Sequence, residues 1–157
     1  MTNPVHIEAP DGVPFIDITR EFDAPVSRVF TAHADPALVA RWMGPDGLTT
    51  DITDWDFVSG GRWAFEQTEP GGQSYGFRGT FHTVRTDELA IQTFEFLGFP
   101  DVVSIETLRF VDLGDGRTRL EAHAVYPSIE ARDGMVDSGM EHGVTQGYAR
   151  LDDLVAG

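Results

Sequence analysis

The stretch that decides the fold is residues 135–155, MVDSGMEHGVTQGYARLDDLV. Its apolar side chains recur at helical spacing, which predicts one long amphipathic helix near the end of the chain. Gly143 and Gly147 lie on or beside the apolar face, where each glycine costs about 1 kcal/mol relative to alanine. Such glycines indicate either close backbone packing or a space left open, and we expect this helix to cover a hollow. The apolar stripe comprises Met140, Val144, Tyr148, Leu151, Leu154 and Val155.

The chain before this helix changes to a hydrophobic period of two, which is typical of β-strands. Turn-forming residues such as Gly71-Gly72 and Gly114-Asp115-Gly116 separate the strands, and connections this short predict antiparallel hairpins. We therefore expect the long helix to lie across a curved antiparallel sheet, with room for a small molecule between them. The strands expected in this region cover residues 48–53, 62–68, 74–85, 89–97, 102–112 and 117–126.

A first strand and two short helices precede that region. Residues 15–22 alternate as a strand, and Pro25 is placed to open a helix. Asp35 is the expected N-cap of a second helix over residues 36–43, which ends at Gly44-Pro45. The predicted fold class is therefore α+β: a curved antiparallel sheet of about seven strands, two short helices after the first strand, and one long C-terminal helix across the sheet.

With 157 residues, the chain is expected to form a single domain over 1–157, with a flexible N-terminal segment at residues 1–12. The absence of cysteine excludes disulfides and thiolate nucleophiles. The sequence has no basic leader with an apolar core and no apolar run near the roughly 20 residues that span a bilayer. We therefore expect a cytoplasmic protein that does not enter a membrane.

The formal net charge of −15 argues against binding to nucleic acid or to anionic membranes, because both need cationic surface. All eleven basic residues are arginine. A lysine Schiff base and the lysine of a phosphate-binding loop are thereby excluded, and we expect no cofactor.

Several short motifs also occur in a characteristic order over nearly the whole chain. They are Phe22-Asp23-Ala24-Pro25-Val26, Arg41-Trp42-Met43-Gly44-Pro45, Gly60-Gly61-Arg62-Trp63-Ala64-Phe65, Gly79-Thr80-Phe81, Gly116-Arg117-Thr118-Arg119-Leu120, and Gly147-Tyr148 before Leu151 and Leu154. Because its motifs occur in this order, the chain resembles the START-like, or Bet v 1-like, helix-grip superfamily, which is also called SRPBCC. Within it, the chain is most similar to the branch named for the activator of Hsp90 ATPase homologue (AHSA1-like).

This resemblance implies a cavity between the long helix and the concave sheet, which the superfamily uses for hydrophobic or amphipathic ligands. It does not imply one activity, because members include ligand carriers, cyclases and stress-linked proteins. The function expected is binding of a small hydrophobic or amphipathic organic molecule. The first alternative is a cyclase-, dehydratase- or isomerase-like enzyme acting on a polyketide-like substrate. The second is a protein-interaction module of the stress-response or chaperone-cofactor type, which pairs through the edge at residues 94–99 or forms a homodimer.

Strand alternation predicts which side chains share a face, and it makes Glu106 the candidate catalytic residue. Glu106 alternates with Leu108, and Gln67 alternates with Trp63. If the apolar members face inward, the polar ones do too, and burial would raise the pKa of Glu106 until it could act as a general acid near pH 7. The alternative is that Gln67 lies at a solvated strand end and that an arginine such as Arg78 pairs with Glu106.

The expected ligand-binding residues come from the strands, the second short helix and the glycine-bearing face of the last helix. Tyr148 offers both an apolar ring and a hydroxyl for the polar end of a ligand, while Tyr75 and Tyr126 could guard an entrance. The full set is Trp42, Trp63, Phe65, Gln67, Phe77, Phe81, Glu106, Leu108, Met140, Gly143, Val144, Gly147 and Tyr148.

The histidines show no spacing typical of metal ligands, so no metal site is predicted. We expect all of them at the surface, including the one on the first short helix. They are His6, His33, His82, His123 and His142.

Overall fold

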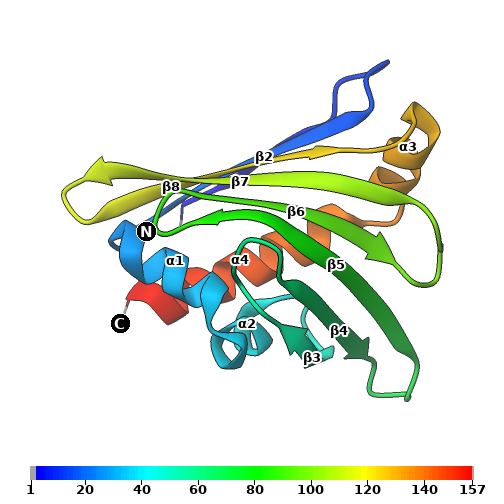
Figure 1. The fold of residues 1–157 in the computed structure, drawn as a ribbon, viewed down its shortest axis with the longest axis horizontal. Coiled ribbons are helices and arrows are strands. Elements are labelled where there is room, and N and C mark those ends of the chain that lie inside the picture. Colours follow the sequence, from blue (N-terminus) through cyan, green and yellow to red (C-terminus); the bar gives the residue numbers. More distant parts are fainter. Residues whose placement is uncertain (1–2, 157) are drawn as a thin grey trace.

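The computed structural model describes residues 3–156, which fold into an eight-stranded antiparallel sheet with helices packed against its concave side (Figure 1). The strand order across the sheet is β1-β2-β8-β7-β6-β5-β4-β3. The strands are β1 (Val5–Glu8), β2 (Phe15–Phe22), β3 (Thr49–Trp55), β4 (Arg62–Thr68), β5 (Ser74–Arg85), β6 (Leu89–Phe96), β7 (Val103–Gly114) and β8 (Arg117–Val125). The helices are α1 (Val26–Ala34), α2 (Pro36–Trp42), α3 (Ile129–Asp137) and α4 (Met140–Ala156).

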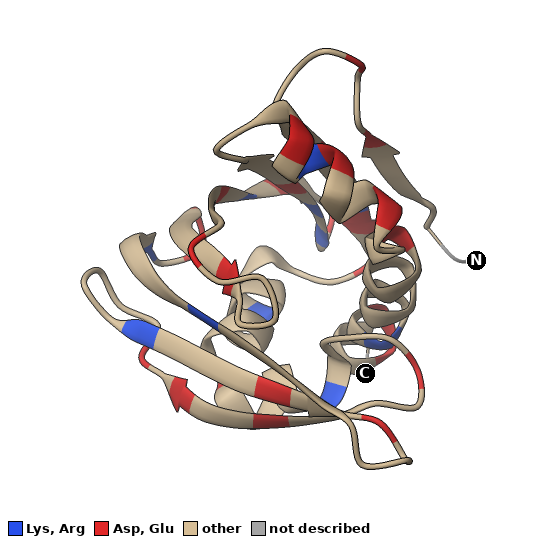
Figure 2. Cartoon of the chain, turned by 90° about the vertical axis from the view of Figure 1, so that its right-hand side faces the viewer, with Lys and Arg blue, Asp and Glu red and all other residues tan. Residues whose placement is uncertain are grey.

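The α+β helix-grip architecture predicted from the sequence is confirmed, with two short helices after the first predicted strand and a long helix at the end of the chain. Figure 2 shows the sheet curving toward α4. The sheet gains one strand over the prediction because β1, at Val5–Glu8, pairs with β2. Most of the segment expected to be flexible is therefore part of the sheet or its first turn, while residues 1–2 of that segment lie outside the described residues.

The predicted pairing edge at residues 94–99 is wrong. These residues include the end of β6, and β6 is hydrogen-bonded to β5 on one side and to β7 on the other. Its backbone groups are therefore already used within the sheet. The strands at the two ends of the sheet are β1 and β3.

The two short helices form as their proline and aspartate signals predict. Pro25 precedes α1, and the Asp35 carboxylate accepts a hydrogen bond from the Ala37 N–H at 2.9 Å, which caps α2. The Trp42 indole N–H donates to the Ala32 carbonyl at 2.9 Å, so the end of α2 is tied back to α1. This bond fixes the loop that follows α2 over the sheet.

The single helix predicted from residue 135 onward is wrong in one respect, because two helices cover this segment. Ser128 caps α3 by accepting from the Ala131 N–H at 3.0 Å, and Gly139 has φ +84°. A right-handed helix cannot continue through that backbone angle, so the chain turns at Gly139 and α4 begins at Met140.

The glycines of α4 mark close packing at the loop after α2. A Cβ at Gly147 would lie 3.1 Å from the Trp42 carbonyl oxygen and 3.4 Å from the Gly44 nitrogen. Arg150, one turn further along, donates to the same Trp42 oxygen at 3.1 Å, and the Gln146 side chain accepts from the Asp46 N–H at 2.6 Å. We call these contacts the α4 clamp. At this part of α4 the glycines therefore reflect close packing and not the hollow that the sequence predicts.

The buried apolar residues form three clusters. The helix-side cluster lies under α1, α2 and the end of α4, the α3-side cluster lies between β2, β8 and α3, and the aromatic cluster lies on β4 and β5. Their central residues are Phe22, Phe110 and Leu151 in the first, Ile16, Ala124 and Tyr126 in the second, and Trp63, Phe65 and Phe81 in the third. Domains of this size usually have one contiguous core. The region where the three clusters meet therefore differs from an ordinary protein interior.

The α4 clamp predicts opposite outcomes for two glycine-to-alanine substitutions in helices. Gly134→Ala in α3 should raise the free energy of unfolding by about 1 kcal/mol, because helix propensity improves and nothing lies within 4 Å of the new Cβ. Gly147→Ala should show no such gain and should destabilise the fold, because its Cβ presses on backbone atoms that the clamp holds. Urea unfolding of both variants measures the difference, and an equal gain from both would contradict the clamp.

Candidate functional site

Glu106 lies on the concave face where the three apolar clusters meet. On β7 it pairs in register with Gln92 of β6 and with Ala124 of β8, which belongs to the α3-side cluster. Gln92 in turn pairs in register with Phe81 of β5, which belongs to the aromatic cluster. Leu108, the next residue of β7 on the same face of the sheet, packs against the helix-side cluster. A polar pair therefore occupies the boundary between the three clusters. The Gln92 side-chain amide donates to the Glu106 carboxylate at 2.9 Å.

Burial raises the pKa of Glu106 to about 7, and the hydrogen bond from Gln92 lowers it only in part. The side chain nonetheless keeps some accessible surface. The raised pKa and the partial exposure are both explained if protein surrounds the carboxyl group on most sides and leaves one side accessible to solvent. Near neutral pH this group is present in both its protonated and its ionised form, so it can donate or accept a proton.

Two tyrosines lie near this carboxyl group. Burial, and then the charge of Glu106, raise the pKa of Tyr126 and of Tyr148 far above the usual range, so both hydroxyls stay protonated. No hydrogen bond within residues 3–156 contributes to either pKa. The raised pKa of each tyrosine therefore reflects burial and charge and not a hydrogen bond.

The two buried arginines near this site are bound to other groups. Arg20, 3% exposed, pairs with Asp152 of α4 at 3.4 Å and donates to the Glu21 carbonyl at 2.8 Å. Arg132, equally buried, pairs with Asp133 at 2.8 Å and also donates to the backbone carbonyls of residues 10 and 15. Neither pairs with Glu106.

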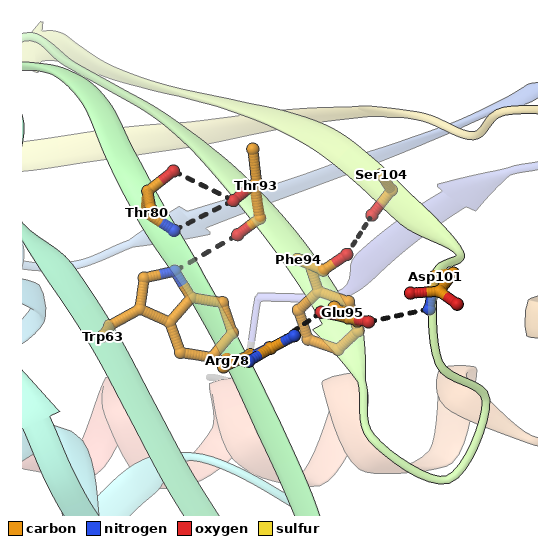
Figure 3. A network of polar contacts seen from close by, with 8 residues as sticks. All are labelled: Trp63, Arg78, Thr80, Thr93, Phe94, Glu95, Asp101 and Ser104. Atoms are coloured by element: carbon orange, nitrogen blue, oxygen red, sulfur yellow. Dashed lines mark hydrogen bonds and ion pairs between the residues drawn. The ribbon is translucent and has the colours of Figure 1, made fainter.

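The sequence analysis left open an ion pair between Arg78 and Glu106. This alternative is wrong. The Arg78 guanidinium donates to Glu95 at 2.9 Å, and Glu95 also accepts from the Asp101 N–H at 2.8 Å (Figure 3). These two bonds, that from Asp101 first, hold the pKa of Glu95 below its usual range. Arg78 and Glu95 face each other in register on the opposite face of the sheet, so Arg78 cannot reach Glu106.

The residues expected to bind a ligand fall into two groups by exposure. The side chains packed into the clusters or against the α4 clamp are Trp42, Trp63, Phe65, Gln67, Phe81 and Gly147. Those that keep partial exposure are Phe77, Glu106, Leu108, Met140, Gly143, Val144 and Tyr148. Within the second group, Gly143 lies against Pro45 at the clamp.

Gln67 does not lie at a solvated strand end. It is buried, and its amide nitrogen fills the space where a Cβ on Gly44 would lie, so it supports the loop after α2. The Gly44 backbone has φ +97°, which favours glycine there in any case. Gln67 pairs with Tyr75 and Thr50, and the register does not bring it beside Glu106.

The expectation that every histidine lies at the surface is wrong for His33. Its ring packs edge-on against Phe110 with the centroids 5.1 Å apart, and its Nδ1 hydrogen-bonds the Val29 carbonyl at 2.8 Å. Burial lowers its pKa to about 4, so the ring is neutral at physiological pH. The residue lies on the inner face of α1, one turn after Val29, and helical spacing from that apolar residue was the signal for its burial.

Sequence reasoning missed Gln92 as a member of this site, and it placed Phe94 only among the aromatic side chains that could line a ligand chamber. Both alternate with Ala90 on β6, so a shared face could have been inferred. Their position beside Glu106 depends on the β6–β7 register, which the hairpin loop sets and the sequence does not reveal. Tyr126 was considered only as an entrance residue, whereas the charge of Glu106 reaches it.

A recess lies on the opposite, convex face, where His6, Asp17, Thr107 and His123 are among the lining residues. Two of its lining residues pair with each other, since His123 and Asp17 are 2.5 Å apart, and a third, Glu121, accepts from Arg119 at 2.9 Å. We regard the concave face as the candidate site, because Glu106 and two tyrosine hydroxyls lie there among apolar clusters, and within residues 3–156 Glu106 pairs only with the neutral amide of Gln92.

Within residues 3–156, no three histidine, aspartate or glutamate side chains are grouped so as to hold a metal ion. In the same part of the chain, no helix has the length and apolar character needed to cross a bilayer.

The raised pKa of Glu106 predicts how stability changes with pH. Between about pH 4.5 and pH 7 the folded chain holds a proton on Glu106 that the unfolded chain has released, so the free energy of unfolding falls as the pH rises. Glu106→Gln should remove this fall, so it should gain up to about 3 kcal/mol over the wild type as the pH rises from about 4.5 to 7, since each pKa unit corresponds to about 1.4 kcal/mol. Urea unfolding at several pH values measures the difference. As a control, Glu66→Gln, at an exposed position of β4, should follow the wild-type profile of stability against pH. If the profile of Glu106→Gln ran parallel to that of the wild type, the raised pKa of Glu106 would be refuted.

Comparison with known proteins agrees with this fold. The family model described as activator of Hsp90 ATPase homolog 1-like protein matches residues 23–156. Protein Ms6760 from Mycobacterium smegmatis has 28% identity and a TM-score of 0.86, with 97% of each chain covered. A protein from Arthrobacter aurescens has 25% identity and a TM-score of 0.87, with 96% of this chain and 91% of that chain covered.

The AHSA1 protein from Silicibacter pomeroyi shares the fold at 22% identity and a TM-score of 0.75, with 90% of this chain and 97% of that chain covered. No curated protein matches the sequence. The fold supports ligand binding or protein interaction in general terms. On the family match over most of its length, the chain belongs to the activator of Hsp90 ATPase homolog 1-like family.

Proposed function

We propose that this protein binds a small hydrophobic or amphipathic organic molecule between α4 and the concave face of the sheet. The observation that carries the proposal is a polar group of Glu106, Gln92, Tyr126 and Tyr148 at the meeting point of three apolar clusters, with hydrogen-bonding capacity that the described chain does not use. Ligand sites typically combine an apolar lining with a few polar groups of this kind, which orient the ligand. A bound molecule would take up this hydrogen-bonding capacity.

Partial exposure of inward-facing apolar residues supports the same proposal. Phe77, Phe94 and Leu108 lie on the concave face and Val144 lies on the apolar stripe of α4, yet all four keep accessible surface. Val144 is also absent from the three apolar clusters. Side chains between a sheet and a helix are normally packed to high density, so retained exposure favours a space that a ligand can enter.

A matched pair of substitutions on α4 tests whether this space binds ligands. Val144→Phe should fill it, whereas Ala149→Phe places the same ring at an exposed position of the same helix. Nile red, a neutral apolar dye, should bind the wild type and Ala149→Phe with increased fluorescence, and Val144→Phe should weaken binding by about tenfold or more. Absence of binding to the wild type, or equal binding by the two variants, would count against the proposal. Circular dichroism confirms that both variants fold.

The second candidate function is acid–base catalysis by Glu106, of the cyclase, dehydratase or isomerase type. The observation that favours it is the pKa of about 7, which suits a group that both donates and accepts protons near neutral pH. Tyr148 could donate a hydrogen bond to a carbonyl oxygen of a polyketide-like substrate, which would stabilise an enolate.

Exchange of the α-protons of 2-tetralone in D₂O, followed by NMR, measures this activity without knowledge of the natural substrate. Catalysis predicts that the wild type accelerates exchange and that Glu106→Gln reduces the rate by about 10²-fold while the ketone still binds. If wild type and Glu106→Gln give the same rate as buffer, the protein binds without this chemistry.

A further inference from the structure

We propose that the natural ligand carries a protonated amine at its polar end, which pairs with the Glu106 carboxylate inside the space between α4 and the sheet. This inference rests on the proposed function, because it assumes that a ligand enters there. It adds the charge of the ligand and the residue that recognises it.

The first argument is that Glu106 lacks a counterion. Its one hydrogen-bond partner within residues 3–156 is the neutral amide of Gln92. An ionised carboxylate in a largely apolar place is stable only when it is paired, and this one has hydrogen-bonding capacity left over. A ligand ammonium group would provide the missing charge and up to three N–H donors.

The second argument is that the protein cannot provide this charge itself. The chain contains arginine but no lysine, and the two arginines whose charge reaches this region are Arg20 and Arg132. Each is held in an ion pair with an aspartate and in hydrogen bonds to backbone carbonyls. The pKa of Glu106 depends on burial and Gln92 alone, without a contribution from either arginine.

The third argument is that the remaining neighbours of Glu106 suit a cation. From the end of β8 and from α4, Tyr126 and Tyr148 present hydroxyl oxygens that can accept an N–H bond. The rings of these tyrosines and of Phe94 offer faces that attract a positive charge. Phe94 extends the aromatic surface toward Trp63, at 5.8 Å between ring centroids, and Phe77, at 5.6 Å, which would accommodate an apolar body.

The overall charge acts in the same direction. With a net charge of −15 the protein attracts organic cations and repels organic anions at long range. Acidic residues are spread over α3, the strands and the connecting loops (Figure 2). An anionic head group beside Glu106 would meet a second negative charge without a basic partner, so fatty or aromatic acids should bind poorly.

The test uses three compounds of one shape: 4-phenylbutylamine, 4-phenylbutan-1-ol and 4-phenylbutyrate. In isothermal titration calorimetry with the full chain, the amine should bind at least about tenfold more tightly than the alcohol, and the acid more weakly than either. The affinity for the amine should rise about tenfold from pH 6 to pH 8, because the ionised fraction of a group with a pKa of about 7 rises by that factor. Glu106→Gln should lose both the preference and the pH dependence, whereas the control Glu66→Gln should keep them.

The outcomes separate this inference from the proposed function. If the alcohol or the acid binds as well as the amine, or if affinity falls as the pH rises, the amine assignment is overturned and ligand binding stands. If none of the three compounds binds while Nile red does, the amine assignment is again overturned. If Nile red also fails to bind the wild type, the proposed function itself is rejected.

Discussion

The rest of the structure depends on the contact between the Gly147 backbone and the Trp42 carbonyl. Trp42 is fixed to α1 through its indole N–H, and α4 approaches this carbonyl closely because position 147 has no side chain. Arg150 and Gln146 then bind the same loop. The contact sets the height of the middle of α4 over the sheet. Gly139, just before the first residue of α4, sets the direction in which the helix leaves α3. The distance between helix and sheet around Glu106 follows from these two points.

The region around Glu106 differs from the interior of an ordinary small domain. Three apolar clusters each have a well-packed centre, but a glutamate, a glutamine and two tyrosine hydroxyls lie where they meet. Placing such groups there costs stability, since apolar residues would fill the same volume without desolvating a carboxyl group. A fold tolerates that cost more readily where it serves binding or chemistry, which is why we place the function at this point.

Much of the fold could be predicted from the sequence because its signals are local. Period-two alternation gave strands close to those observed, and proline and aspartate gave the starts of α1 and α2. The predictions failed where contacts between residues far apart in the sequence determine the structure. β1 forms because β2 is there to pair with it, His33 is buried because Trp42 and Phe110 pack around it, and Gln92 reaches Glu106 through a register that a loop determines. Alternation alone thus made Glu106 a candidate but did not reveal its pairing with Gln92.

The α4 clamp and the surroundings of Glu106 involve different residues. Gly147, Arg150 and the loop after α2 hold the helix, whereas Gln92 hydrogen-bonds Glu106 and Val144 belongs to none of the three apolar clusters. Substitution of Gln92 or Val144 therefore removes none of the clamp contacts. A gene duplicate of this chain could therefore acquire a different ligand through a few point mutations and remain folded at every step, which makes the architecture readily evolvable.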